Sequence, residues 1–206
     1  MRIQFTEGNW ERYFNYAYTR RFSHTPEFIQ EADCIVNARK SEFTTILLKD
    51  RYAPGTRISF TTSFESYGAP LLVIVKDLER DEQGNLRFWD YQEIVLWEKG
   101  VNVWNLQKDE TNSGSTPWNG FSAVDNGIRI DWLMSSCHPV QAGKRYTMTV
   151  ELGRQLIKVW VDGHDFDLRI PGLPENVYLG ITGCEGINRF YDLEILERML
   201  KNQNPF

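Results

Sequence analysis

The alternation of apolar and polar residues over short stretches is the feature that most constrains how this chain can fold. Along 156–161 and 190–195, for example, apolar residues recur at every second position, which is the period of a β-strand. Helical periodicity is almost absent, and only 25–32 and 193–200 are expected to form short helical turns. Twelve stretches are predicted as strands: 34–38, 43–49, 56–64, 71–77, 89–98, 101–106, 127–134, 146–152, 156–161, 165–170, 177–182 and 190–195.

Turn residues separate these strands in the way that antiparallel hairpins require. Asn126-Gly127 and Asp162-Gly163 each place two residues that tolerate a positive φ between two strands, which predicts two tight hairpins. No repeat, linker or low-complexity tract divides the 206 residues. Many short strands with turn signals between them favour an all-β fold. We therefore expect a two-sheet antiparallel jelly-roll sandwich that forms a single domain, residues 1–206.

Charge and composition argue against several classes of function. The formal net charge of −5 does not provide the basic surface that binding to a phosphate backbone requires. The longest apolar run, 71–75, is far shorter than the roughly 18 residues that span a membrane. The three histidines and three cysteines are widely spaced, and no glycine-rich phosphate loop opens a helix. We therefore expect no nucleic-acid or membrane partner, no metal and no cofactor.

The cysteines and the start of the sequence bear on the cellular compartment. Cys34, Cys137 and Cys184 are odd in number and far apart, so we expect free thiols. The first residues reach an acidic side chain at Glu7 without an apolar stretch, so no secretory signal is recognised. Both observations predict a cytoplasmic protein.

Four stretches in the C-terminal half carry a resemblance to a known superfamily. They are 143–152 (GKRYTMTVEL), 157–163 (IKVWVDG), 177–183 (VYLGITG) and 190–195 (FYDLEI). Their succession resembles the closing strands of a concanavalin A-like jelly roll, the fold of laminin-G-like, galectin-like and beta-glucanase-like domains. The resemblance implies the two-sheet sandwich, whereas domains of this fold carry many unrelated functions.

An aromatic row on one predicted strand, 89–98, is the most informative candidate site. Alternate side chains of a strand share a face, so Trp89, Tyr91, Glu93 and Trp97 are expected to lie in one row. Sugars present flat apolar C–H faces and a rim of hydroxyls, so aromatic rings around a carboxylate are their natural complement. The row therefore predicts a carbohydrate-binding face.

Four residues on neighbouring strands are assigned to the same face. Asn102 and Trp104 share one face of the next strand and extend the row. Arg129 and Asp131 share a face of a later strand and are assigned as polar partners for hydroxyl groups, with a surface ion pair between them as the alternative. We therefore predict a protein that binds a mono- or oligosaccharide on the concave face of one sheet.

Core packing is the competing role for the tryptophans, of which the chain has seven. Sandwich cores are rich in aromatic side chains, and we expect Trp10 and Trp132 to lie in the core. The same role remains the alternative for Trp89, Trp97 and Trp104.

The long polar stretch 108–119 is unusual for a simple connection between strands. It is rich in Gly, Ser and Thr, and Trp118 lies at its end. Two interpretations stay open, a binding loop over the site and a surface loop without a role.

An enzyme is the alternative function, a glycoside hydrolase or polysaccharide lyase that acts through paired carboxylates. Glu93 and Glu98 have the spacing of the bulged Glu-x-Asp-x-x-Glu motif of beta-glucanase-like domains, in which the outer carboxylates act in a retaining mechanism. Val95 replaces the central aspartate of that motif, and Asp131 is a second candidate partner for Glu93. A third interpretation is a homo-oligomer in which the exposed aromatic side chains pack against a second copy.

Overall fold

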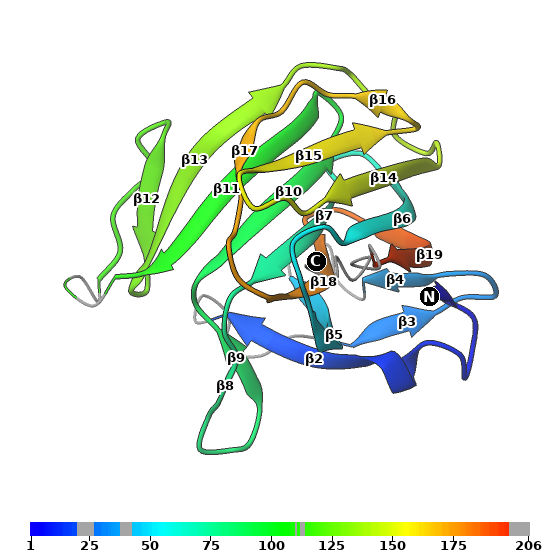
Figure 1. Ribbon diagram of the computed structural model, residues 1–206, viewed down its shortest axis with the longest axis horizontal. Helices are drawn as coiled ribbons and strands as arrows, with labels where there is room; N and C mark the ends of the chain where they lie inside the picture. Colours follow the sequence, from blue (N-terminus) through cyan, green and yellow to red (C-terminus); the bar gives the residue numbers. More distant parts are fainter. Residues whose placement is uncertain (20–26, 38–42, 110, 112–113, 198–206) are drawn as a thin grey trace, which may run out of the picture.

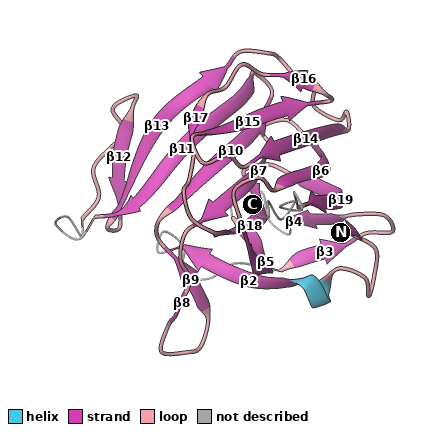
Figure 2. Ribbon diagram, in the orientation of Figure 1, coloured by secondary structure: helices cyan, strands magenta, loops and turns pink. Residues whose placement is uncertain are grey.

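The computed structural model describes residues 1–19, 27–37, 43–109, 111 and 114–197. Two β-sheets form the framework of the described chain (Figure 1). The one helical element of the described residues is the three-residue 3-10 helix Glu11–Tyr13, drawn in cyan in Figure 2. No helix of the described residues is long and apolar enough to cross a membrane.

The first sheet, called the front sheet, has ten strands in the described part of the chain. From edge to edge they are β12 (Ser122–Asp125), β13 (Ile128–Ser136), β11 (Gly100–Lys108), β10 (Tyr91–Trp97), β7 (Ala69–Val75), β18 (Val177–Cys184), β5 (Thr44–Tyr52), β2 (Phe14–Thr19), β9 (Leu86–Phe88) and β8 (Glu79–Arg80). All neighbours are antiparallel except β2 and β9, which run parallel. Because successive side chains of a β-strand point to opposite faces, every second side chain of these strands points away from the other sheet.

The second sheet, called the back sheet, is entirely antiparallel. Its strands follow the order β16 (His164–Asp165), β15 (Leu156–Val161), β14 (Tyr146–Glu151), β6 (Arg57–Phe64), β19 (Asn188–Leu196), β4 (Ile35–Asn37) and β3 (Phe28–Gln30), with β1 (Arg2–Gln4) beside β19 and β17 (Ile170–Pro171) beside β15. The fold is thus the all-β two-sheet sandwich predicted from the alternation.

The core lies between the two sheets and is rich in aromatic side chains. The ring of Phe190 on β19 lies 5.9 Å from that of Phe60 on β6 and 5.8 Å from that of Phe28 on β3, between ring centroids. From the front sheet, Leu72 and Ile94 enter the same core. Apolar side chains in such close contact supply the main stabilising contribution to a sandwich of this size.

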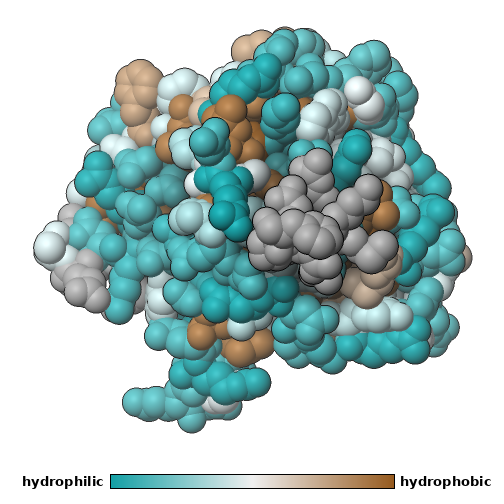
Figure 3. Space-filling model, viewed as in Figure 1, coloured by the Kyte–Doolittle hydropathy of each residue, from teal (hydrophilic) through white to brown (hydrophobic). Residues whose placement is uncertain are grey.

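A second apolar cluster lies on the opposite face of the front sheet, which we call its outer face. Leu71, Val73 and Val75 point to this face from β7, and Val95 joins them from β10. All seven residues of β7 are therefore buried, because both faces of this central strand are covered. On the face seen in Figure 3 the surface is largely hydrophilic, and hydrophobic side chains form a few patches.

Both predicted hairpins are confirmed. Asn126 and Gly127 join β12 to β13 with φ angles of 50° and 75°, and Asp162 and Gly163 join β15 to β16 with φ angles of 50° and 80°. Two successive positive φ angles are the signature of the tight hairpin turn that matches the twist of the strands.

Several local predictions were wrong. The expected helical turn at 25–32 contains strand β3, which pairs with β4, and residues 20–26 lie outside the described part. The carbonyl of the Gln30 side chain accepts a hydrogen bond of 2.8 Å from the Trp10 indole, so tertiary contacts override local preference. The tail expected to be helical from 193 continues as β19 to Leu196, and residues 198–206 lie outside the described part.

The stretch 165–170, expected as one strand, forms only the ends of two short pairings. β16 ends at Asp165 and β17 begins at Ile170, while the buried side chains of Phe166 and Leu168 lie between them. These two residues are buried at alternate positions, which gives the same sequence pattern as a β-strand. The segment between them nevertheless does not form the hydrogen bonds of a strand pair.

Candidate functional site

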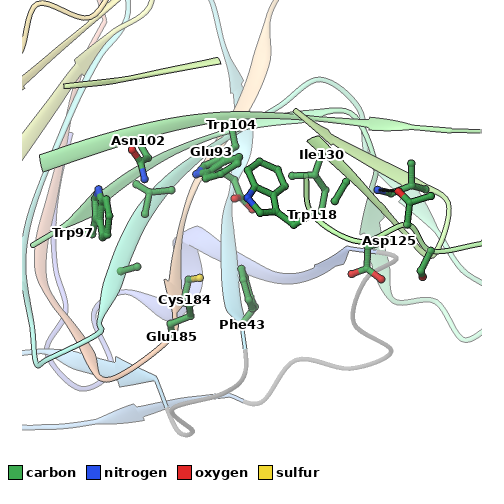
Figure 4. A pocket seen from close by; sticks show the side chains of 16 residues that line it. Phe43, Glu93, Trp97, Asn102, Trp104, Trp118, Asp125, Ile130, Cys184 and Glu185 are labelled. Carbon is green, nitrogen blue, oxygen red and sulfur yellow. Dashed lines mark hydrogen bonds between the residues drawn. The ribbon is translucent and has the colours of Figure 1, made fainter. Parts of the chain in front are cut away.

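A cavity of about 610 Å³ lies on the outer face of the front sheet. Its volume is within the range of about 300–1,000 Å³ that is common for small-molecule sites. Figure 4 shows its lining side chains converging from β10, β11, β13 and the segments that adjoin them. They are Phe43, Ala69, Glu93, Val95, Trp97, Asn102, Trp104, Ser115, Thr116, Trp118, Ala123, Val124, Asp125, Ile130, Cys184 and Glu185.

The floor of the cavity is set by strand register. Glu93 on β10 lies opposite Trp104 on β11 and Val73 on β7, and Val95 lies opposite Asn102. The Glu93 side chain is only 7% exposed, since apolar neighbours flank it on both adjacent strands. A carboxylate held in such surroundings can offer a strong hydrogen bond to a ligand, because little water competes for it.

Tryptophan side chains form the walls. The ring of Trp104 lies 5.1 Å from that of Trp118, with an angle of 63° between the ring planes. Trp97 stands on the other side of Asn102 in Figure 4, and the Lys99 ammonium lies 5.3 Å from the centroid of the Trp97 ring. Trp118 is 47% exposed, so it can contact a ligand from above the sheet.

Hydrogen bonds fix the segment that carries Trp118. Thr116 pairs with Val124 of β12 in an isolated bridge, and its hydroxyl accepts a hydrogen bond of 2.8 Å from the Val124 amide. The Asn119 side chain accepts hydrogen bonds from the amides of Phe121 and Ser122, at 3.0 and 2.9 Å. This part of the long polar stretch is therefore held over the cavity, while residues 110 and 112–113 of it lie outside the described part.

Two further carboxylates lie at the margin of the cavity. Asp125 ends β12, and Glu185 follows β18 directly (Figure 4). Among the described residues that line the cavity, Glu93, Asp125 and Glu185 are the acidic ones, and none is Lys or Arg. The site therefore offers hydrogen-bond acceptors on three sides of an aromatic hollow.

Four of the eight predicted binding residues are brought together here: Glu93, Trp97, Asn102 and Trp104. The other four lie outside the cavity. Trp89 precedes β10, and its indole N–H donates to the Glu79 carboxylate. Tyr91 points to the outer face but is buried against Phe88, with ring centroids 4.7 Å apart.

Arg129 and Asp131 form an ion pair with each other, at 3.0 Å between Nε and Oδ2. Ile130, between them on β13, points into the cavity, so these two side chains take the opposite face of the strand. They are not positioned as partners for a ligand in the cavity.

Glu98, the second carboxylate of the motif expected for an enzyme, also lies outside the cavity. β10 pairs with β11 without a register shift up to Trp97, so the strand contains no bulge. Glu98 is exposed in the turn that follows, away from Glu93.

The remaining tryptophans divide between core and surface. Trp10 is buried as predicted. Trp132 is only half-buried, with its ring 6.0 Å from that of Phe121. Trp160 lies on the back sheet beneath the Arg57 guanidinium, 5.3 Å from the ring centroid.

Sequence reasoning missed the lining residues that come from turns and from strand ends. Phe43 directly precedes β5, and Cys184 and Glu185 lie where β18 ends. Strand periodicity carries no signal at such positions, because the direction of the side chain depends on the path of the turn. The signal for Trp118 was present in the length and polarity of its loop.

Across the described ranges, no group of three or more His, Cys, Asp or Glu side chains is arranged to hold a metal ion. Cys34, Cys137 and Cys184 form no disulfide bonds with one another.

No protein-family model matches this sequence, and no curated protein sequence matches it. Solved structures, in contrast, match nearly the whole chain. A carbohydrate-binding module, CBM66 from Bacillus subtilis, is 10% identical, with a TM-score of 0.57 over 88% of this chain and 94% of the module. A glycoside hydrolase family 16 endo-glucanase from Bacteroides ovatus is 11% identical, with a TM-score of 0.58 over 95% of this chain and 99% of the enzyme.

The exoplasmic/lumenal domain of VIP36, solved in a Ca²⁺/Man3GlcNAc-bound form, is 12% identical. Its TM-score is 0.57 over 98% of this chain and 90% of the domain. Likeness at such low identity concerns the backbone, and it agrees with the two antiparallel sheets described above. The chain has the concanavalin A-like jelly-roll fold.

Proposed function

We propose that the protein binds a carbohydrate in the cavity on the outer face of the front sheet. The observation that carries this proposal is the arrangement of Trp97, Trp104 and Trp118 around the buried Glu93 carboxylate. Indole rings offer flat apolar surfaces to the C–H faces of a sugar. The Glu93 carboxylate and the Asn102 amide supply an acceptor and a donor for its hydroxyl groups.

The comparisons support this ligand class. One similar structure is named as a carbohydrate-binding module, one is an endo-glucanase, and one holds a mannose-containing saccharide. Since fold alone does not determine function, the side chains of the cavity carry the argument. Their mixture of aromatic surface and hydrogen-bonding groups fits a sugar better than it fits a purely apolar ligand.

A glycan array followed by calorimetric titration tests the proposal. Wild type is expected to bind at least one saccharide, and Trp97→Ala and Trp104→Ala are expected to weaken that binding about tenfold or more. Trp160→Ala is the matched control, because it removes an indole from the back sheet. Absence of saccharide binding by the folded wild type would overturn the proposal, and so would equal loss of affinity in the control.

Catalysis is the second candidate, and one observation favours it: Glu93, Asp125 and Glu185 all line the same cavity. Glycoside hydrolysis needs two carboxyl groups on either side of the scissile bond. In this arrangement Glu93 would act with Asp125 or Glu185, and not with the expected Glu98.

A turnover assay on each saccharide that binds distinguishes the two functions. If the protein is an enzyme, Glu93→Gln abolishes product formation, whereas Glu98→Gln leaves it intact because Glu98 does not line the cavity. Binding without any turnover by wild type would rule out hydrolysis of that ligand and leave the binding function standing.

A further inference from the structure

A second cavity, of about 500 Å³, adjoins the first one. It is lined by Glu65, Ser66, Tyr67, Glu185 and Gly186. Glu185 lines both cavities, so the two cavities are neighbours on either side of this residue. A ligand that fills the first cavity and extends past Glu185 therefore enters the second.

Two turns build the second cavity, and both connect the back sheet with the front sheet. One turn joins β6 to β7 and carries Tyr67, and the other joins β18 to β19 and carries Glu185. The Glu65 amide donates a hydrogen bond of 2.9 Å to the carbonyl of Ile187, which ties the first turn to the second. The Gly68 amide closes the first turn with a hydrogen bond of 2.8 Å to the carbonyl of Glu65.

Buried asparagines hold the second turn from below. The Asn188 side chain donates to the carbonyls of Cys184 and Glu185, at 3.0 and 2.9 Å. The Asn37 side chain donates to the carbonyl of Gly186 at 2.9 Å. Both asparagines are almost completely buried, so their hydrogen bonds fix the backbone on which Glu185 stands.

Tyr67 is held in a conformation that a bulky residue rarely adopts. Its φ is +65°, in the left-handed region, where a side chain larger than hydrogen is disfavoured. The next residue must be glycine, because a Cβ at Gly68 would lie 2.6 Å from the Cβ of Phe64. Backbone strain of this kind persists where surrounding contacts impose it, and it is concentrated at binding sites.

The ring of Tyr67 projects from this fixed turn into solvent. At 81% exposed, Tyr67 is the most exposed large hydrophobic residue of the described chain. Exposure alone does not make a site, since single exposed aromatic residues are common. Here it coincides with a cavity that shares Glu185 with the first one, and with a turn whose backbone is held by hydrogen bonds.

From this continuity we propose a second sugar subsite, in which Tyr67 is the stacking platform for an oligosaccharide that extends from the first cavity past Glu185. The inference rests on the proposed carbohydrate binding and deepens it, because it assigns the ligand class as an oligosaccharide. A preformed aromatic platform binds at low entropic cost, since the turn is ordered before the ligand arrives.

Titration with oligosaccharides of increasing length tests the second subsite. The probes are neutral homo-oligosaccharides of glucose, mannose, galactose and fructose, each from one to six units, measured by calorimetry. For the sugar that binds, affinity is expected to rise by roughly 2- to 10-fold at the length that reaches Tyr67, the contribution of one aromatic contact.

Tyr67→Ala is expected to remove this gain and to leave the affinity for the shortest ligands unchanged. Tyr67→Phe is the matched control, because it keeps the ring and should keep the gain. Trp118→Ala serves as the reference for the first cavity and should weaken ligands of every length. Circular dichroism establishes that each variant is folded.

The outcomes separate the two proposals. If no saccharide of any length binds wild type, the proposed function itself fails. If short ligands bind while longer ones bind no better, or if Tyr67→Ala retains the gain, the second subsite is wrong and the first cavity still binds sugar.

Discussion

Trp104 and Trp118 meet edge to face, with ring centroids 5.1 Å apart and an angle of 63° between their planes. Trp104 belongs to a strand of the front sheet, whereas Trp118 belongs to the polar segment that passes over it. Such a pair contributes about 0.5–1.5 kcal/mol beyond the area that it buries. One wall of the cavity therefore depends on a loop that is held against a strand.

Replacing Trp118 should affect saccharide affinity more than the free energy of unfolding. We expect Trp118→Ala to weaken saccharide binding about tenfold and to lower the free energy of unfolding by no more than about 1.5 kcal/mol, because the side chain is 47% exposed. Titration calorimetry and urea denaturation measure the two quantities. Trp118→Phe should recover part of the affinity, and a variant that loses stability without losing affinity would contradict the assigned role.

The role of the Glu93 carboxyl group on the cavity floor can be tested by comparing two Glu→Gln variants. Glu93→Gln keeps the shape of the side chain and replaces its carboxyl group by an amide, so we expect the loss of a carboxyl hydrogen bond to lower affinity by a factor of about 10 or more. Glu98→Gln makes the same chemical change in an exposed turn outside the cavity and should leave affinity unchanged. Equal effects in the two variants, measured by titration, would argue against a ligand contact at Glu93.

A hydroxyl pair near the centre of the front sheet should show strong energetic coupling. The hydroxyls of Thr45 on β5 and Thr182 on β18 lie 2.8 Å apart, and both side chains are buried. Each single change to Val leaves one buried hydroxyl without this partner and should lower the free energy of unfolding by about 1–2 kcal/mol. The double variant should cost at least about 0.5 kcal/mol less than the sum, as a double-mutant cycle by urea denaturation would show. Simple additivity would contradict the coupling.

The ion pair on the back sheet predicts a dependence of stability on pH. A hydrogen bond of 3.1 Å from Arg189 lowers the pKa of the Glu31 carboxyl below its ordinary value of 4.5. The folded state then binds fewer protons than the unfolded state near this value, so the stabilisation is complete above pH 4.5 and is lost as the pH falls through the lowered pKa.

Glu31→Gln should therefore lower the free energy of unfolding at pH 7, by less than about 1 kcal/mol because the pair is partly exposed. The difference from wild type should be smaller at pH 3, because the stabilisation is lost progressively once the pH falls below the ordinary pKa of 4.5. Urea denaturation at the two pH values checks this, with Arg189→Gln as the reciprocal variant. A difference of the same size at pH 3 would show that the carboxylate charge is not involved.

Strand periodicity predicted much of the fold, and half of the candidate site residues line one cavity. Along β10 the alternation placed Glu93, Val95 and Trp97 on one face, and the structure confirms that they share the cavity. Trp89 departs from this row because the strand begins only at Tyr91. There the backbone carbonyl of Asp90 accepts from the Lys76 amide and its carboxylate from the Lys108 amide, which interrupts the alternation.

Arg129 and Asp131 lie outside the cavity for a different reason. Apolar residues of a sandwich strand usually face the core, so Ile130 was expected to point inward and its polar neighbours outward. The outer face of the front sheet has its own apolar cluster, and Ile130 packs at the margin of that cluster. When both faces of a sheet are partly apolar, hydrophobicity no longer distinguishes the inner face from the outer one.

The two turns that carry Tyr67 and Glu185 are two of the places where the chain passes from one sheet to the other. An oligosaccharide held by both turns and by the front sheet would therefore bridge the seam of the sandwich. The unfolded chain does not bring the two turns together, so the ligand would bind only the folded state. Its binding free energy would therefore hold the two sheets together and raise the melting temperature of the whole domain.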